Sequence, residues 1–415
     1  MNARQTALLI LNEIETKKTY ANLGIKNMLE KADLGEKALA TELVYGVLRY
    51  KLNLDYIRNC FSKINENKLS VSVKNILRIG IYQIMYLSKV PDSAACNESV
   101  KLVYKYSHKG SVGFVNAVLR NVVRNKDSIS YPANLKEKFM YKYSFPEDIV
   151  DIVMRDYGID AENILTELNK NKKMCIRPNL LKTDLSQLES FLNGYSYIKG
   201  EKCFYVKGIS VDGLKEFQQG LFSVQDRASM MCAELLNPEN YDKVLDLCAA
   251  PGGKSAYMAE LMNNSGEIIS CDLHEHRTEL IKNTALRLGI NIITAIQNDA
   301  SVFNQAFKDA FDKVLVDVPC SGLGVISGKP DIKWTQRDYD SLVSIQKQIF
   351  KNALLYVKKD GYVVYSTCTI NKAENENLVK EVLYDNDNYV LEESVQLLPC
   401  NKNDGFYMCR IKRIK

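Results

Sequence analysis

Apolar residues in the first 126 positions recur every three or four residues, which is the spacing of one helix face. Ala7, Leu8 and Leu11 form one such run, and the segment 76–85 forms another. The same stretch contains a single proline, so little interrupts a helix there. The pattern therefore predicts an all-α domain over residues 1–126.

The pattern becomes mixed over residues 127–220. Turn signals at Pro132 and Pro146 are each followed by a helical run. Short apolar segments such as Cys203–Val206 are typical of strands. We expect a small α+β domain that links the first domain to the last.

From residue 221 to residue 415, short β-rich runs alternate with helical segments such as 276–288 and 339–357. The predicted strands are Val244–Leu247, Glu267–Cys271, Asn291–Ile296, Lys313–Val316 and Tyr362–Tyr365. This alternation predicts an α/β domain with a doubly wound parallel sheet, the Rossmann-like arrangement. Ligands of such folds bind beyond the carboxyl ends of the strands, so the residues that follow each strand are the functional candidates.

Charge is distributed unevenly over these domains. The chain carries 55 Lys and Arg against 50 Asp and Glu, a net charge of +5. Residues 1–126 hold 20 of the basic and 10 of the acidic residues, so the remainder has a net charge of −5. A basic domain joined to an acidic one favours a polyanion held by the first domain. A lysine-rich solvated surface is the alternative.

Cysteine usage and the N-terminus limit the class of protein. The eleven cysteines include no CxxC spacing, and the three histidines form no zinc pattern. No stretch is apolar enough to span a membrane, and the N-terminus lacks the apolar core of a signal peptide. We therefore expect a cytoplasmic protein with reduced thiols, no metal and no membrane partner, acting as a monomer.

A loop of small residues follows the first strand of the last domain. Such a loop lets the backbone approach a ligand, and the next helix offers free N–H groups. It fits neither the dinucleotide fingerprint GxGxxG nor the P-loop GxxxxGK[ST]. The candidate cofactor-binding residues here are Cys248, Ala249, Ala250, Pro251, Gly252, Gly253 and Lys254.

Two acids follow the next two strands. Asp272 is placed to accept hydrogen bonds from ribose hydroxyls, and Asp299 to accept one from an adenine amine. Arg277, in the helix after Asp272, is included in the same site. The alternatives are a helix cap at Asp272 and a plain turn at Asp299. Together the loop and the two acids predict an adenosyl ligand.

Two cysteines follow the fourth and fifth strands. Cys320 lies in a Pro-Cys motif three residues after Asp317, and Cys368 lies in a Thr-Cys motif. Parallel strands end at one edge of a sheet, so both thiols should lie beside the adenosyl site. The alternative is a pair of ordinary buried cysteines.

This combination resembles the Nol1/Nop2/Sun family of RNA cytosine-5 methyltransferases, and within it the bacterial branch that acts on 16S ribosomal RNA. The resemblance covers nearly the whole chain, and the paired Pro-Cys and Thr-Cys motifs are its most specific part. Other segments that carry it are Gly113–Asn121, Ile176–Asn179, Ser223–Ser229 and Asp404–Tyr407. It implies a NusB-like helical RNA-binding domain, a small pre-catalytic domain and a class I methyltransferase domain. One departure is Asp148, which stands in the region where the family commonly has Trp.

The resemblance also implies the reactants and the roles of four residues. The methyl donor would be S-adenosylmethionine, and the substrate a cytosine of 16S ribosomal RNA, naked or in early small-subunit particles. Carbon 5 of cytosine attacks a methyl group only after a thiolate has added to carbon 6. By resemblance Cys368 is that nucleophile and Cys320 assists its release. Asp317 would bond the N3/N4 edge of the base and belong to the cofactor site, and Lys254 would polarise the base and lower the thiol pKa.

Three other functions fit parts of the sequence. A DNA cytosine-5 methyltransferase would use the Pro-Cys cysteine as nucleophile and would carry a target-recognition domain after it. An amino-methyltransferase would have Asn/Asp-Pro-Pro-Tyr in place of the Pro-Cys run. An RNA-binding or antitermination factor with a decayed catalytic domain would account for the helical half, but every catalytic position is intact.

Overall fold

The computed structural model describes residues 1–17 and 34–415. The chain divides into two compact units, each of which is described by itself. The first unit comprises Met1–Asn169 together with Lys329–Thr335, and the second comprises Lys170–Gly328 together with Gln336–Lys415. The division into domains 1–126, 127–220 and 221–415 stays a prediction.

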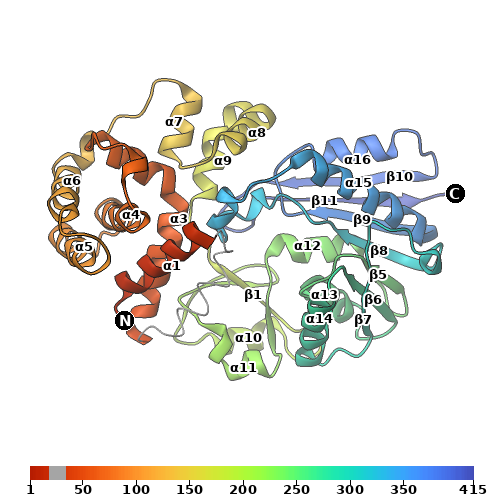
Figure 1. Cartoon of the computed structure of the whole chain (residues 1–415). Helices are drawn as coiled ribbons and strands as arrows, with labels where there is room; N and C mark the ends of the chain where they lie inside the picture. Colours follow the sequence, from red (N-terminus) through yellow and green to blue (C-terminus); the bar gives the residue numbers. More distant parts are fainter. Residues whose placement is uncertain (18–33) are drawn as a thin grey trace. The chain divides into compact units, whose positions relative to one another are not determined.

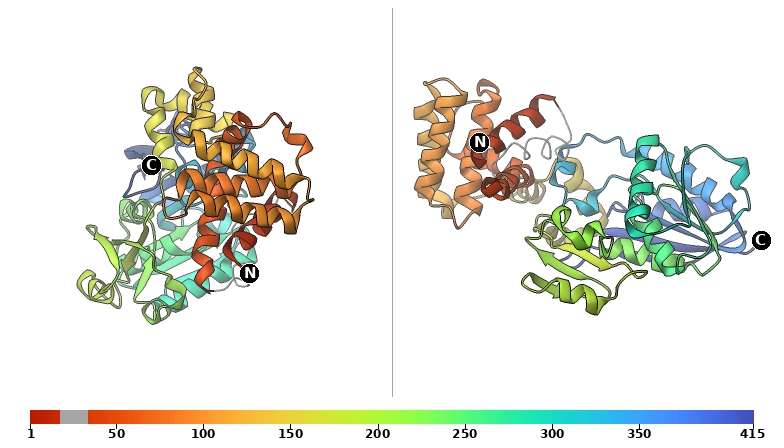
Figure 2. Two further views of the ribbon diagram at one scale, coloured as in Figure 1. Left: turned by 90° about the vertical axis from the view of Figure 1, so that its left-hand side faces the viewer. Right: turned by 90° about the horizontal axis from the view of Figure 1, so that it is seen from below.

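The described part of the first unit is helical (Figures 1 and 2). Its α-helices are α1 (Ala3–Lys17), α3 (Lys37–Cys60), α4 (Val71–Tyr86), α5 (Asp92–Tyr106), α6 (Ser111–Asn125), α7 (Leu135–Lys142), α8 (Glu147–Tyr157) and α9 (Ala161–Leu168). Helix α4 lies at the centre, with Ile76, Leu77 and Ile81 fully buried. Its first turn is capped by Ser70, whose hydroxyl accepts the Val73 N–H at 3.3 Å. The predicted all-α domain is confirmed for the residues described.

Asp148 lies in the first turn of α8, directly after Glu147 and two residues after Pro146. Proline suits the start of a helix because it lacks the N–H that would otherwise be left unpaired there. Acidic side chains in the first turn interact favourably with the helix dipole. The residue that departs from the family pattern is therefore suited to its local structure.

Helix α3 has an internal kink at Tyr50, whose φ of −113° and ψ of 19° are not helical. The kink diverts hydrogen bonds that would otherwise run along the helix. The Leu52 N–H donates instead to the Ser144 hydroxyl at 2.9 Å. The carbonyl of Leu48, one turn earlier in the helix, is thus left to another donor.

The short helix Pro330–Trp334 supplies donors to this kink. Trp334 Nε1 donates to the Leu48 carbonyl at 2.7 Å, and Lys333 Nζ donates to the Arg49 carbonyl at 2.8 Å. The Lys333 ammonium also donates to the Ser144 carbonyl and to the Asn169 side chain. Burial lowers the pKa of Lys333, and these oxygen acceptors are the groups that compensate its desolvation. Residues 329–335 are thereby an integral part of the first unit.

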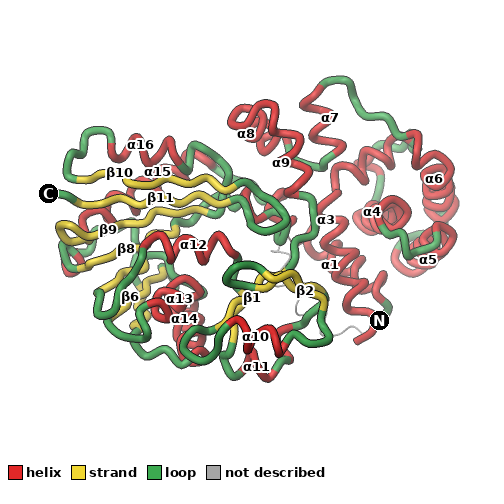
Figure 3. Tube along the Cα trace, turned by 180° about the vertical axis from the view of Figure 1, so that it is seen from behind, coloured by secondary structure: helices red, strands yellow, loops and turns green. Residues whose placement is uncertain are grey.

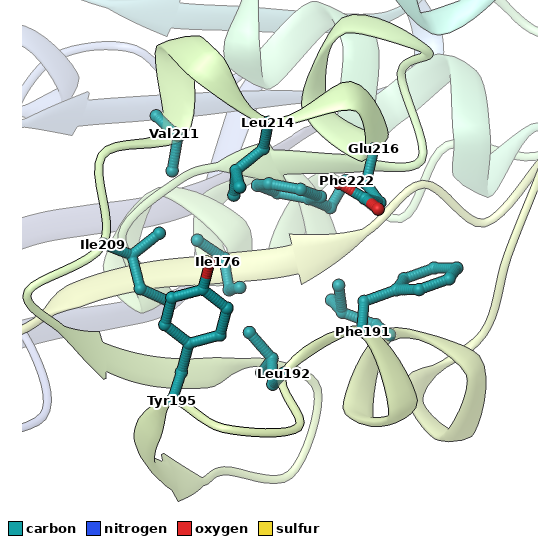
Figure 4. Close-up of a pocket in the computed structure, with 10 residues that line it drawn as sticks. Ile176, Phe191, Leu192, Tyr195, Ile209, Val211, Leu214, Glu216 and Phe222 are labelled. Carbon is teal, nitrogen blue, oxygen red and sulfur yellow. The ribbon is translucent and has the colours of Figure 1, made fainter.

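The second unit begins with a small sheet of four antiparallel strands in the order β2-β3-β1-β4. Its elements are β1 (Met174–Pro178), α10 (Leu185–Phe191), β2 (Ser196–Lys199), β3 (Phe204–Lys207), α11 (Lys215–Gln218) and β4 (Phe222–Val224). The predicted strand at Cys203–Val206 corresponds to β3. The two helices enclose an apolar cavity of about 130 Å³, lined by Ile176, Leu192 and Phe222 among others (Figure 4). None of the predicted site residues lines this cavity.

The larger sheet has seven strands in the order β10-β11-β9-β8-β5-β6-β7 (Figure 3). Its strands are β5 (Lys243–Asp246), β6 (Glu267–Asp272), β7 (Ile293–Gln297), β8 (Phe311–Asp317), β9 (Val357–Thr367), β10 (Tyr389–Leu397) and β11 (Phe406–Arg413). The five predicted strands are present and parallel, which confirms the Rossmann-like class. The sheet also has two further strands that make it mixed: β11 pairs antiparallel with β9, and β10 pairs antiparallel with β11. Most of β10 is exposed, so it lacks the apolar alternation that marks a strand.

Helices cover both faces of this sheet (Figure 1). One core includes residues of α12 (Arg227–Leu236), α13 (Gly253–Leu261) and α14 (Glu275–Leu288). The other includes residues of α15 (Tyr339–Tyr356) and α16 (Glu376–Leu383). No helix within the described residues has the length and apolar character needed to cross a membrane. The carboxyl ends of the parallel strands therefore lie between two helical layers, as the predicted site requires.

Candidate active site

The two cysteines lie on loops that leave neighbouring parallel strands. Asp317 is in register with Ser366, so β8 and β9 end side by side. Cys320 follows the first strand and Cys368 follows the second. Their sulfur atoms are 3.1 Å apart, and both side chains are partly exposed. The structure thus brings together two residues that are 48 positions apart, at the sheet edge that the sequence indicated.

The Cys320 sulfur contacts both the backbone and the side chain of Cys368. It accepts a hydrogen bond from the Cys368 backbone N–H at 3.3 Å, and it shares a thiol proton with the Cys368 sulfur. The hydrogen bond with Cys368, together with burial, raises the pKa of Cys320 well above its ordinary value. At neutral pH Cys320 is therefore a protonated thiol, which can donate a proton but is a weak nucleophile.

Lys254 and Asp317 form an ion pair at the same strand ends. Lys254 Nζ donates to Asp317 Oδ2 at 2.7 Å, and Ser366 Oγ donates to Asp317 Oδ1 at 2.8 Å. Burial would lower the pKa of Lys254, but the Asp317 carboxylate outweighs it, and the pKa is raised. The lysine therefore stays charged and fixes the orientation of the carboxylate next to the cysteine loops.

The predicted cofactor loop connects β5 to α13 and is held by backbone hydrogen bonds. The Ala249 N–H donates to the Cys271 carbonyl at 2.8 Å, which ties the loop to β6. Gly252 has a φ of +100°, and a Cβ there would lie 3.1 Å from Ile281 Cα, so a side chain is excluded. A Cβ at Gly253 would meet no atom within 4 Å. The first turn of α13 therefore faces open space, which fits a ligand that approaches the backbone.

Asp272 ends β6 and is 4% exposed. It accepts the His274 N–H at 3.2 Å and pairs with Arg277 at 3.3 Å. Arg277 also donates to the Ala250 carbonyl at 3.3 Å. The predicted residues Asp272, Arg277 and Ala250 are therefore in mutual contact. The alternative to a ribose contact was a helix cap; Asp272 binds the N–H of His274, the N-cap residue of α14, and His274 itself makes no side-chain cap bond.

Asp299 lies exposed two residues beyond the end of β7. Its carboxylate accepts both the N–H and the hydroxyl of Ser301, at 2.9 and 2.7 Å. These contacts are those of a plain strand-end turn. A contact with adenine stays a prediction.

One acid at this site was not among the predicted residues. Asp246, at the end of β5, is 1% exposed and accepts the Ser255 hydroxyl at 2.6 Å. Its other oxygen has no hydrogen-bond partner among the described residues. Burial raises the pKa of Asp246 to about 6. Its position directly before a loop of small residues was the sequence signal that could have identified Asp246.

Within residues 1–17 and 34–415, no group of three or more His, Cys, Asp or Glu side chains is placed to hold a metal ion.

Comparison with known proteins agrees with this arrangement. A family model described as 16S rRNA methyltransferase RsmB/F matches residues 233–412, and a NusB family model matches residues 1–124. A Bacillus subtilis protein named probable ribosomal RNA small subunit methyltransferase B is 36% identical, and the match covers 99% of each chain. The chain belongs to the RsmB/F family of 16S rRNA methyltransferases. A Synechocystis relative with the same name is 31% identical over all of both chains.

Solved structures support the fold. The crystal structure of PH0851 has a TM-score of 0.82 and 22% identity, and the match covers 100% of this chain and 99% of that one. A methyltransferase homologue from Pyrococcus horikoshii has a TM-score of 0.60 and 25% identity, covering 68% of this chain and 100% of that one. The first domain of this family member is NusB-like and the last is a Rossmann-like methyltransferase domain, as predicted.

Proposed function

We propose that this family member transfers a methyl group from S-adenosylmethionine to carbon 5 of a cytosine in 16S ribosomal RNA, through a covalent bond to Cys368. The observation that carries this proposal is the pair of thiols 3.1 Å apart at the ends of β8 and β9. One cysteine serves for attack on carbon 6, and a second thiol in contact with it is suited to assist the release of the enzyme from the base.

Each step has a residue suited to it. The Cys368 sulfur donates an electron pair to carbon 6, which makes carbon 5 electron-rich. The Lys254–Asp317 pair presents a fixed carboxylate that can accept a hydrogen bond from the amino edge of the ring. After transfer, the carbon 5 proton passes to a water molecule, its bonding pair re-forms the ring double bond, and the Cys368 sulfur departs with the electron pair of its bond to carbon 6. Cys320, in contact with Cys368, is placed to assist that release, and a protonated thiol can return a proton to the departing sulfur.

The methyl donor fits the loop between β5 and α13. When bound, S-adenosylmethionine supplies an electrophilic methyl group. Gly253 leaves the backbone accessible, Asp272 would accept hydrogen bonds from the ribose, and Asp299 would accept one from the adenine amine. The target base must be single-stranded or flipped to reach the thiols, at a cost of roughly a few kcal/mol.

The direct test measures transfer of labelled methyl groups to 16S RNA that lacks the modification, followed by analysis of the nucleosides. We expect label in 5-methylcytidine, with unmethylated RNA as substrate and a DNA of the same sequence as the control. Label in another nucleoside, equal labelling of the DNA, or no label at all would contradict the proposal. Comparison of naked RNA with early small-subunit particles defines the form of the substrate.

Binding of RNA by the first domain is part of the same proposal. Arg120 and Arg124 lie one turn apart on the exposed face of α6. If both contact phosphates, replacing both with Glu should weaken RNA binding and reduce the slope of log affinity against log salt by roughly 2, about 0.9 for each contact. The control replaces the exposed Lys351 and Lys380 with Glu. An unchanged salt slope in the α6 variant would assign this face to a protein partner or to solvent.

A further inference from the structure

Glu374 and Asn375 are adjacent, fully buried polar residues just before α16. Their side chains have zero exposure, so neither can touch RNA or a methyl donor without a rearrangement of the fold. Asn375 occupies the N-cap position of α16, yet its side chain does not cap the helix. A capping residue whose side chain is used elsewhere requires an explanation, because capping by Asn typically contributes about 1 kcal/mol.

Glu374 holds the loop that carries Cys320. Its Oε2 accepts the Ser321 N–H at 2.8 Å, directly after the cysteine. The same oxygen accepts Gln346 Nε2 at 2.9 Å, and Gln346 Nε2 also donates to the Pro319 carbonyl at 2.9 Å. The residues on both sides of Cys320 are thus fixed by one buried carboxylate, directly or through Gln346.

Asn375 holds the loop that carries Cys368 in an equivalent way. The Thr367 hydroxyl donates to Asn375 Oδ1 at 2.6 Å, directly before the cysteine. Asn375 Nδ2 donates to the Thr369 carbonyl at 3.1 Å, directly after it. The same amide nitrogen donates to Gln396 on β10 at 2.7 Å. One side chain therefore fixes both neighbours of Cys368.

We infer that Glu374 and Asn375 are positioning residues, the first for Cys320 and the second for Cys368. Their adjacency in the chain makes one short segment responsible for the alignment of both thiols. A buried carboxylate has to be satisfied by donors, and two of its three donors, Ser321 N–H and Gln346 Nε2, restrain the Cys320 loop. The assignment of different reaction steps to the two positions rests on the proposed function; the assignment of one residue to each thiol does not.

The test compares Glu374→Gln with Asn375→Ser and uses two readouts. The first is the alkylation rate of each cysteine by iodoacetamide, read by peptide mass spectrometry in the absence of RNA and methyl donor. Losing one hydrogen bond to a charged group corresponds to roughly tenfold in an equilibrium. Glu374→Gln should therefore raise the Cys320 rate on the order of tenfold and leave Cys368 within about twofold, and Asn375→Ser should do the reverse.

The second readout is the covalent complex between enzyme and RNA on a denaturing gel. Glu374→Gln should accumulate methylated RNA bound to the protein, because release is impaired. Asn375→Ser should lose methyl transfer and the complex together, because attack is impaired. Matched controls are Glu381→Gln and Asn377→Ser, at exposed positions of the same helix.

The outcomes separate the claim that each residue positions one thiol from the claim about the reaction step that each thiol performs. If alkylation shifts as expected but the gel phenotypes exchange, the positioning is correct and the roles of the cysteines are wrong. If both variants affect the same cysteine, or the controls shift as much, the positioning is wrong. Gln346→Met breaks only the hydrogen bonds of Gln346 to the Pro319 carbonyl and to Glu374. It is used in place of Glu374→Gln if that variant does not fold. An unchanged Cys320 rate in Gln346→Met overturns the inference.

Discussion

The loops of Cys320 and Cys368 leave adjacent strands at the same edge of one sheet, but they are stabilised by contacts of different range. Around Cys368, the contacts of Thr367 and Thr369 with Asn375 join residues at most eight positions apart. Around Cys320, the contacts of Pro319 and Ser321 reach Gln346 and Glu374, which are 27 and 53 positions away. The bonds from Asn375 to the neighbours of Cys368 are thus local, whereas the bonds from Gln346 and Glu374 to the neighbours of Cys320 come from distant parts of the chain.

The pKa of Cys320, the thiol whose neighbours are held by remote groups, is raised by its hydrogen bond with Cys368 and by burial. A nucleophile has to be placed accurately in every turnover, so a short and independent set of contacts suits it. A residue that acts only at release tolerates a placement that depends on remote groups.

Replacement of either cysteine by alanine should give the largest effects. Cys368→Ala should reduce methyl transfer by about 10⁴-fold or more and leave no covalent complex, because carbon 5 is never activated. Cys320→Ala should instead form a denaturation-resistant complex that contains methylated RNA. Both variants must first bind the methyl donor as the parent does. A complex that survives loss of Cys368 and vanishes on loss of Cys320 would assign the roles as in DNA methyltransferases.

Changes to the Lys254–Asp317 pair should have the next largest effect. Asp317 ends β8, the strand that leads to Cys320, and accepts a hydrogen bond from Ser366 on β9, the strand that leads to Cys368. It should therefore serve both attack and release. Asp317→Asn should lower the single-turnover rate by about 10²–10³-fold, the usual loss for a group that stabilises developing charge. Alkylation of both cysteines should stay unchanged. A rate within threefold of the parent would limit the pair to a structural role.

Asp272→Ala should weaken methyl-donor binding while leaving both loops intact. Loss of hydrogen bonds to a charged group costs roughly 1.5–3 kcal/mol, which corresponds to about tenfold or more in affinity. Calorimetry measures the effect, and thermal unfolding verifies that the fold is kept. An affinity equal to that of the parent would leave Asp272 only its turn-stabilising bond to His274.

The direct link between the loops should contribute least. The Ser321 and Thr369 hydroxyls share a buried hydrogen bond of 2.7 Å. A double-mutant cycle with Ser321→Ala and Thr369→Val should give a coupling of about 0.5–1.5 kcal/mol in urea unfolding. Additive effects, with no coupling, would show that the loops are stabilised independently.

The difference between contacts that are short-range and long-range along the chain also explains what the sequence could predict. Cys368, Cys320, Asp272 and the loop before α13 could be predicted as candidates because strand ends are local signals and a parallel sheet collects them at one edge. Glu374, Asn375 and Gln346 were missed because a buried polar residue looks like a surface residue until its partners are known. The polar residues that directly follow the Thr-Cys motif were the sequence signal that could have indicated Glu374 and Asn375.

Within the large sheet, the five parallel strands were predicted, whereas the antiparallel strands β10 and β11 were not, although most of β11 is buried. The first four predicted strands agree with β5–β8 to within two residues, and β9 begins at Val357 rather than at Tyr362. The edge strand β10 was not predicted, because its sequence YVLEESVQL groups apolar residues together and polar residues together, which gives no period-two pattern. The insertion of Lys333 and Trp334 into the kink of α3 was also missed, since no local pattern marks a contact between residues 286 positions apart.

That insertion has a consequence for how the polypeptide is made. The kink of α3 is completed by side chains that leave the ribosome only after Thr335 has been synthesised, although the rest of the first unit ends at Asn169. At about 5–20 residues per second, the intervening stretch takes roughly 8–33 s to translate. Throughout that interval the nascent helical unit holds the Leu48 and Arg49 carbonyls without their final donors. Its maturation is therefore timed by the synthesis of the Cys320 loop, and the N-terminal half cannot reach its final state ahead of the segment that carries that cysteine.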